Sequence, residues 1–146
     1  MKQMLNAMMV LVAQSFDGVY DKGGTPYIMH CLAVMHKLRS ADEELQCIAL
    51  GHDLIEDTKV TYQQLYDLGF SERVVLGIAA MTKQRGQTYE QYKSQVKANK
   101  DAILVKMSDL QHNSDLRRLK GVTAKDVDRV AKYMAFYQEL KNELAK

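Results

Sequence analysis

A scarcity of helix-breaking residues constrains the fold of this chain more than any other feature of its sequence. The 146 residues include one proline and eight glycines, so long stretches contain no residue that interrupts regular structure. Tryptophan is absent, and β-branched residues do not alternate with polar ones as they do in half-buried strands. The sequence therefore predicts an all-α protein, and its length fits one domain over residues 1–146.

Apolar spacing and capping residues divide the chain into seven or eight helices. Three pairs are spaced as capping boxes, in which a side chain at the helix start accepts a hydrogen bond from the first turn: Ser40 with Glu43, Thr61 with Gln64, and Thr123 with Asp126. The glycine-rich segment 17–26 is the expected binding loop. The predicted helices span residues 1–16, 27–39, 40–56, 61–69, 71–82, 101–118 and 123–146, with one more beginning at Thr88.

Charge and hydrophobicity exclude several classes of partner. A net charge of +2 gives no electrostatic basis for binding nucleic acid or an anionic membrane. The apolar run over residues 4–13 is too short for a membrane span. It resembles the apolar segment of a signal peptide, but the polar residue Asn6 interrupts it. Cys31 and Cys47 lack metal-ligand spacing and are expected to be buried thiols in a reducing compartment. We therefore expect a cytoplasmic protein.

The densest cluster of polar residues is GHDLIEDT, residues 51–58, on an otherwise apolar helix. In a helix, His52 lies one turn from Glu56 and Asp53 one turn from Asp57, on neighbouring faces. Three carboxylates and an imidazole in one patch repel one another unless a cation or a strong donor is present. The alternative interpretation is a solvated acidic helix end, since a His-Asp dipeptide alone is weak evidence.

A second polar cluster follows an apolar helical run. Asp109, His112 and Asn113 share one face at spacings of three and four residues. A carboxylate beside such a run is costly to bury unless it is paired or bound to a metal. A salt bridge from Asp109 to Lys106 or Arg117 is the alternative.

His30 lies on a strongly apolar helix just after the glycine-rich loop. A single histidine in this setting is more often a hydrogen-bonded core residue than a ligand. Together with His52, Asp53 and Asp109, however, it supplies four nitrogen and oxygen ligands from three predicted helices. Imidazole and carboxylate ligands suit Mn²⁺, Fe or Zn²⁺ better than Ca²⁺. The sequence thus predicts a site for a divalent transition metal.

Three segments in this order and spacing resemble a known family: GGTPYIMH at 23–30, GHDLIEDT at 51–58, and VKMSDLQHN at 105–113. They are similar to the HD-domain hydrolases of the RelA/SpoT group, in particular the small stand-alone alarmone pyrophosphohydrolases. The segment MTKQRGQTYEQY at 81–92 resembles the family too. The resemblance runs from the first helix to about Leu119, and we expect no room for the synthetase domain of the long bifunctional relatives.

The resemblance implies metal ligands, an acidic pair that orients and activates water, and contacts to the substrate. The basic loop 83–87 contains two further positively charged side chains, which by their charge could stabilise the leaving pyrophosphate. The metal ligands, usually for manganese, are His30, His52, Asp53 and Asp109; the acidic pair is Glu56 and Asp57; the substrate contacts are Lys22 at the phosphates and Asn113 near the nucleoside, with Lys83 and Arg85 added from charge.

The expected activity is metal-dependent removal of the 3′-pyrophosphate from guanosine tetra- or pentaphosphate, a small nucleotide substrate. Two departures favour an alternative, because Asp21 and Leu110 stand where the family usually has arginines. That alternative is an HD-type phosphohydrolase of another nucleotide, such as a 2′- or 3′-phosphorylated dinucleotide cofactor. A third possibility is a catalytically silent, nucleotide-binding helical module. Cys31 also replaces a usual proline, and Gly51, a costly residue within a helix, predicts close packing.

Overall fold

The chain forms an all-helical structure, as predicted. The computed structural model describes residues 4–146, so the first three residues of the helix predicted over 1–16 lie outside the described part. Within 4–146 the only strand pairing is an isolated bridge between Tyr20 and Pro26. The helices are α1 (Met4–Ser15), α2 (Ile28–Lys37), α3 (Glu43–Gly51), α4 (Leu54–Asp57), α5 (Tyr62–Asp67), α6 (Glu72–Met81), α7 (Tyr89–Lys97), α8 (Lys100–Asn113) and α9 (Ala124–Leu144), with a 3₁₀ turn at Leu116–Arg118.

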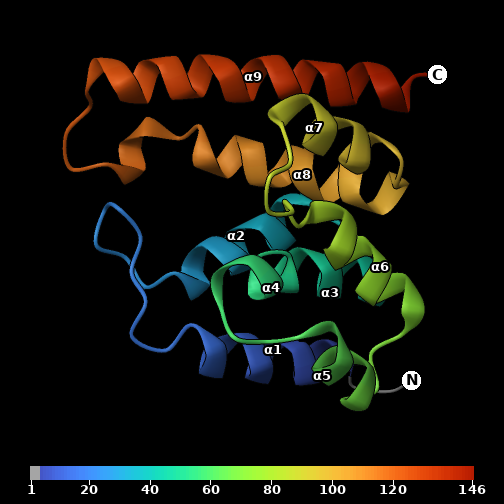
Figure 1. Cartoon of the computed structure of the whole chain (residues 1–146). Helices are drawn as coiled ribbons and strands as arrows, with labels where there is room; N and C mark the ends of the chain where they lie inside the picture. The colour runs from blue at the N-terminus through green and yellow to red at the C-terminus, as the bar shows by residue number, and fades with distance from the viewer. Residues whose placement is uncertain (1–3) are drawn as a thin grey trace.

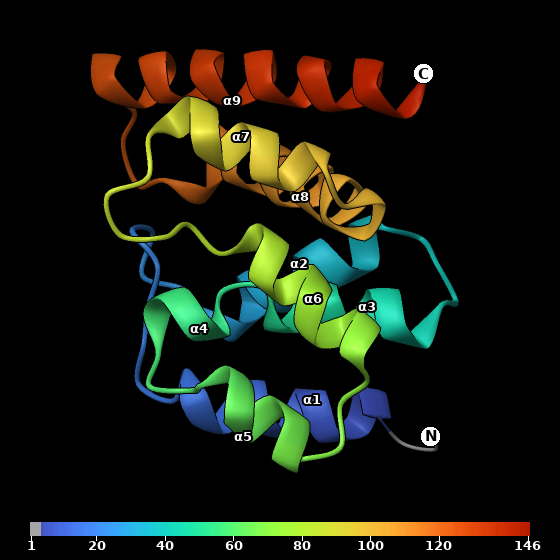
Figure 2. The same cartoon turned by 45° about the vertical axis from the view of Figure 1, so that its right-hand side comes forward.

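Helix α3 lies at the centre because it is apolar around most of its circumference. Its residues from Cys47 to Gly51 are all buried, a pattern typical of a helix enclosed by others. It packs against α1, α2, α6 and α8. Figure 1 shows α1 and α5 below this central layer and α9 above it, lying along α8. The rotated view in Figure 2 shows α7 and α8 together beneath α9.

Local capping signals are confirmed at most helix starts. Thr61, Thr88 and Thr123 each open a helix with a complete capping box, and Ser71 caps α6. The prediction of a capping box formed by Ser40 and Glu43 is wrong. Asp42 caps α3 instead, because its carboxylate accepts hydrogen bonds from the N–H groups of the following turn.

The helix predicted over 40–56 is broken into α3 and the single turn α4. His52 still has helical backbone angles, but Asp53 has φ −102° and ψ 0°, outside the helical range. Counting α3 and α4 as the one predicted helix gives the eight expected. The break rotates the residues that follow, so the acidic end of the segment faces a different direction from α3.

The helix predicted over 101–118 ends early. Helix α8 stops at Asn113, and Asp115 then accepts a hydrogen bond from the N–H of Arg117 to begin the 3₁₀ turn. The regular α-helix therefore ends at Asn113, the last predicted site residue of α8.

Gly51 and Gly77 allow three helices to approach closely. A Cβ atom on Gly77 would lie 2.4 Å from Cδ1 and 2.8 Å from Cγ1 of Ile48 in α3. A Cβ on Gly51 would lie 3.0 Å from side-chain atoms of Met8 and Ile78. The close packing predicted at Gly51 is thus confirmed.

The two cysteines are buried and unpaired, as predicted. Burial raises the pKa of each thiol to about 12. Across residues 4–146, every helix is too short or too polar to cross a membrane.

Candidate metal centre and nucleotide pocket

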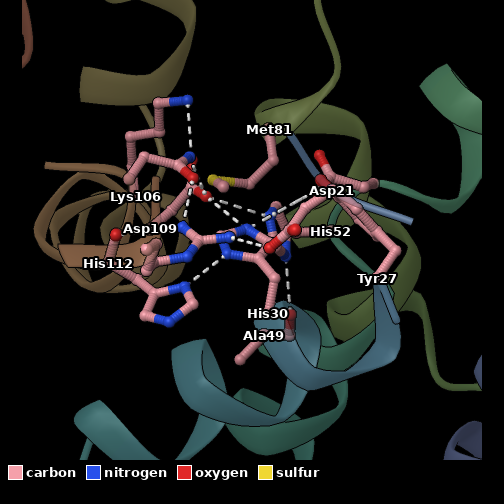
Figure 3. Close-up of polar contacts among 12 residues, drawn as sticks. Asp21, Tyr27, His30, Ala49, His52, Met81, Lys106, Asp109 and His112 are labelled. Carbon is pink, nitrogen blue, oxygen red and sulfur yellow. Dashed lines mark hydrogen bonds and ion pairs between the residues drawn. The ribbon is translucent and has the colours of Figure 1, made fainter. Parts of the chain in front are cut away.

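The four predicted metal ligands lie together at the centre of the bundle. Nε2 of His30, from α2, is 2.9 Å from Oδ1 of Asp109, from α8. Nε2 of His52, at the end of α3, is 3.3 Å from the same oxygen and 3.0 Å from Oδ2 of Asp53. Figure 3 shows His30, His52 and Asp109 pointing toward one another. Ligand atoms of these three residues lie within 4.8 Å of one another, close enough for one ion.

His52 has a buried nitrogen that fits a cation. Its Nδ1 lies 2.7 Å from the carbonyl oxygen of Ala49, an acceptor, so Nδ1 carries a proton. Its Nε2 is buried and makes no hydrogen bond within the described residues, although carboxylate oxygens lie nearby. A buried polar atom of this kind requires an explanation, and a metal ion beside it is one. The two imidazoles and two carboxylates are the donor set expected for Mn²⁺, Fe or Zn²⁺.

Asp109 remains ionised although it is buried. Burial alone would raise its pKa, but the charges of Lys106 and His52 and a hydrogen bond from His30 outweigh burial and hold the pKa well below its usual range. Lys106 Nζ lies 3.0 Å from Oδ2, and Asn113 donates to Oδ1 at 3.0 Å. The alternative pairing of Asp109 with Lys106 is therefore present, and it leaves Oδ1 directed at the histidines.

Behind His30 lies a second imidazole, that of His112. The two Nδ1 atoms are 2.7 Å apart, so one ring donates a hydrogen bond to the other. Burial, with the charge of Arg118, lowers the pKa of His112 to about 4, so this ring is neutral at pH 7. If Nε2 of His30 binds a metal, its Nδ1 must carry the proton and donate to His112.

Tyr27 holds Asp53 on the opposite side. Its hydroxyl donates to Oδ2 of Asp53 at 2.5 Å, and its ring packs on Phe16 with centroids 4.9 Å apart. Burial and the charge of Asp53 raise the pKa of the Tyr27 hydroxyl, so it stays a donor.

Glu56 and Asp57 lie on α4 with Asp53, and one carboxylate oxygen from each falls within 4.8 Å of the others. Glu56 accepts a hydrogen bond from the backbone N–H of Lys83 at 2.8 Å. Burial, with the charges of Asp53 and Glu56, raises the pKa of Asp57 to about 6. A carboxylate with this pKa can accept a proton near neutral pH.

A pocket of about 340 Å³ adjoins the cluster. Tyr27 and Asn113 link the two, because each lines the pocket and donates a hydrogen bond to an aspartate of the cluster. Lys22 also lines the pocket, as does Asn113, and the substrate contacts of both stay a prediction. Lys83 and Arg85 are exposed in the loop before α7 and do not line it. The other lining residues are Tyr20, Asp21, Gly23, Asp115, Leu116, Arg118, Leu119, Arg129 and Tyr133.

The two departures from the family pattern differ in their surroundings. Asp21 lines the pocket and accepts a hydrogen bond from Arg118 at 3.0 Å, so its charge is compensated. Leu110 is only 1% exposed and packs in the core. Asp21 therefore does not present an isolated negative charge to a phosphate, although it stands where the family usually has an arginine.

Three residues outside the predicted ligand set support the site: the sequence offered Lys106 as a partner of Asp109 and grouped His112 with Asp109, but it gave no sign of Tyr27. Tyr27, His112 and Lys106 each make a hydrogen bond to a predicted metal ligand. The spacing of Lys106 and Asp109, three residues apart on one helix, was a signal for that pair. No local pattern linked Tyr27 to Asp53 or His112 to His30, because 26 and 82 residues separate them.

Comparison with known proteins gives consistent matches. A guanosine-3′,5′-bis(diphosphate) 3′-pyrophosphohydrolase of Aquifex aeolicus is 35% identical over 102 residues, 63% of this chain and 14% of the relative. One of Haemophilus influenzae is 30% identical over 135 residues, 84% of this chain and 20% of the relative. The chain thus spans a fifth or less of the length of these relatives. No protein-family model matches it.

A solved structure shows the same fold. It belongs to a metazoan ortholog of SpoT, described as hydrolysing ppGpp and playing a role in starvation responses. The TM-score is 0.75 at 23% sequence identity, covering 96% of this chain and 84% of that one.

The chain thus shares its all-α fold with that structure, and in this chain two buried histidines and two aspartates lie together at the centre of the bundle. In sequence, the chain is similar to RelA/SpoT-type hydrolases over the part of their length that it spans.

Proposed function

We propose that this protein is a metal-dependent hydrolase that removes pyrophosphate from the 3′ position of guanosine tetra- or pentaphosphate. The observation that carries the proposal is the convergence of His30, His52 and Asp109 beside a pocket that contains Lys22. The names of the relatives support the substrate. The buried free thiols and a nucleotide substrate agree with a cytoplasmic location.

In this proposal His30, His52, Asp53 and Asp109 hold the metal, with manganese as the expected ion. When bound, a divalent cation would lower the pKa of a water molecule toward about 7 and polarise a phosphoryl oxygen. Glu56 and Asp57 lie beside Asp53 and take the proton from the attacking water. General-base action of this kind contributes roughly 10²- to 10⁴-fold.

The pocket residues position the nucleotide. Lys22 is exposed at the pocket and makes no ion pair within the described residues, so its charge is available to the phosphates. Asn113 donates to Asp109 and also lines the pocket, which supports a contact between Asn113 and the nucleoside side of the substrate. The backbone N–H of Lys83 donates a hydrogen bond to Glu56. The side chains of Lys83 and Arg85 lie in the exposed loop before α7, so they could contact the leaving pyrophosphate only from that loop.

The test is release of pyrophosphate from guanosine tetraphosphate by purified protein, with and without Mn²⁺. Asp53→Ala is expected to lose bound metal and activity together, whereas Glu56→Ala keeps the metal and loses turnover. Asp128→Ala, an exposed aspartate on α9, serves as the control and keeps both. Activity and stoichiometric metal in Asp53→Ala would contradict the assignment.

A different phosphorylated nucleotide is the second candidate, because a core leucine, Leu110, stands where the family usually has an arginine. Bound manganese without release from guanosine tetraphosphate would favour it, and 2′- or 3′-phosphorylated dinucleotides are the substrates to assay next. Nucleotide binding without bound metal or hydrolysis would instead indicate a silent binding module.

A further inference from the structure

The pocket contains an arginine whose position is unusually well determined. Nη1 of Arg118 donates to the carbonyl oxygen of His112 at 3.0 Å and to Oδ1 of Asn113 at 3.1 Å. Its Nη2 donates to Oδ2 of Asp21 at 3.0 Å. These bonds tie the side chain to the end of α8 and to the loop before α2, across 97 residues of sequence.

Asp21, the loop residue that pairs with Arg118, is also held by hydrogen bonds. Oδ1 of Asp21 accepts a hydrogen bond from the N–H of Thr25 at 2.9 Å, so both carboxylate oxygens are occupied. Gly23 lies against the backbone of Arg118, since a Cβ there would fall 2.0 Å from the Arg118 carbonyl oxygen. Arg118 therefore sits at a junction of two segments that both line the pocket, and its charge is balanced by Asp21.

The remaining donors of Arg118 determine what it can recognise. A guanidinium has five N–H groups, and the bonds above leave Nε–H and one Nη2–H without a partner among the described residues. A charge-balanced guanidinium attracts phosphate less than the unpaired Lys22 does. Two neighbouring N–H donors match two neighbouring acceptors on an uncharged edge.

Guanine offers such an edge, with O6 and N7 as adjacent acceptors, whereas adenine offers N7 beside the N6 donor. The tyrosines Tyr20, Tyr27 and Tyr133 supply apolar surface in the same pocket for a base ring. We infer that Arg118, anchored by Asp21, is the specificity-determining residue that reads the guanine base. The inference rests on the proposed function and assigns the base recognition within it.

The first experiment measures binding rather than turnover. Guanosine 5′-diphosphate and adenosine 5′-diphosphate are titrated calorimetrically into protein kept in EDTA. Wild type is expected to prefer the guanine nucleotide by about tenfold. Arg118→Lys keeps the charge but loses the two-donor edge, and its preference is expected to fall to about one.

The matched control is Arg117→Lys, because Arg117 is 91% exposed, pairs with Asp115 and does not line the pocket. It is expected to keep the wild-type preference. Should Arg118→Lys fail to fold, Asp21→Asn weakens the anchor instead, because it removes the negative charge and one acceptor oxygen, and it is expected to lower the preference at least threefold. No guanine preference in wild type, or an unchanged one in folded Arg118→Lys or Asp21→Asn, overturns the inference.

A second experiment compares kcat/KM for the guanosine and adenosine 3′,5′-bis(diphosphates). For the guanosine substrate, Arg118→Lys is expected to lower kcat/KM by raising KM, with kcat nearly unchanged. If wild type binds guanosine 5′-diphosphate selectively but releases no pyrophosphate, the proposed function fails while the base recognition stands. Release from both substrates at equal kcat/KM overturns the base recognition alone.

Discussion

His30 and His112 are joined by a hydrogen bond of 2.7 Å between their Nδ1 atoms, although 82 residues separate them. The bond fixes the ring plane of His30 and thus the direction of its other nitrogen, which faces Asp109. Partners of this kind behind a metal-binding histidine orient the ligand and set which nitrogen carries the proton.

Replacing His112 is therefore expected to weaken metal binding. His112→Ala removes the acceptor behind His30, and the expected loss is about 10- to 100-fold in Mn²⁺ affinity. The measurement is a manganese titration followed by electron paramagnetic resonance. His36→Ala, an exposed histidine on the same helix as His30, is the control. Equal affinities in the two variants would show that His112 does not orient His30.

Tyr27→Phe tests the support of Asp53. The variant keeps the ring that packs on Phe16 and loses only the hydroxyl that donates to Asp53. We expect kcat to fall about tenfold while the melting temperature changes by less than about 4 °C, since a hydrogen bond contributes roughly 1 kcal/mol. Tyr66→Phe, on an exposed side chain, should change neither value. Full activity in Tyr27→Phe would refute the role.

Ionisation of Asp57 makes the free energy of unfolding of the metal-free protein depend on pH. Burial and neighbouring carboxylates raise its pKa from 3.8 to about 6, so between these values the folded protein binds a proton that the unfolded chain does not. Stability contributed by this proton is complete below pH about 4 and is lost as the pH rises through about 6.

The substitution Asp57→Asn removes the ionisable carboxyl group and therefore the loss of stability at higher pH. Because Asp57 is only partly buried and solvent screens its charge, we expect a gain of only about 1 kcal/mol at pH 7.5, or roughly 2–4 °C in melting temperature. Melting in EDTA from pH 4 to pH 8 measures it, with Asp128→Asn as the control. A gain that is the same at pH 4 would mean that ionisation is not its cause.

Gly77→Ala sets two effects against each other. Alanine favours a helix interior by about 1 kcal/mol. However, its Cβ would meet Cγ1 of Ile48 at 2.8 Å, an atom near the backbone that cannot move away easily. Overpacking costs about 1–3 kcal/mol, so net destabilisation is expected in urea unfolding. Gly121→Ala meets no atom within 4 Å and should be neutral; a stabilised Gly77→Ala would show that α3 and α6 separate readily.

Features determined by neighbouring residues could be predicted from the sequence. Thr61 and Thr123 were recognised as capping residues because each capping box lies within four positions of the chain. His30, His52 and Asp109 were grouped by their ligand chemistry and then by resemblance to a family, and the structure brings their ligand atoms within 4.8 Å of one another. Their role as metal ligands stays a prediction.

Features created by the packing of distant segments could not be predicted. The break at Asp53 accompanies a contact between distant segments, in which the backbone N–H of Lys83, in the loop before α7, donates to Glu56 of α4. Asp21 looked unfavourable in the sequence because its partner, Arg118, lies 97 residues away. A charge near a phosphate site has a defined effect only once its neighbours in space are known.

The order of the site residues along the chain has a consequence for synthesis on the ribosome. His30 and His52 emerge early, but Asp109 follows 79 residues after His30, and the pocket wall also needs Arg129 and Tyr133 from α9. A nascent chain therefore holds no complete centre until the segment through Tyr133 has left the ribosome. Under the proposed function, products of interrupted translation that lack α8 and α9 would have neither Asp109 nor this pocket wall, and they would leave the nucleotide intact.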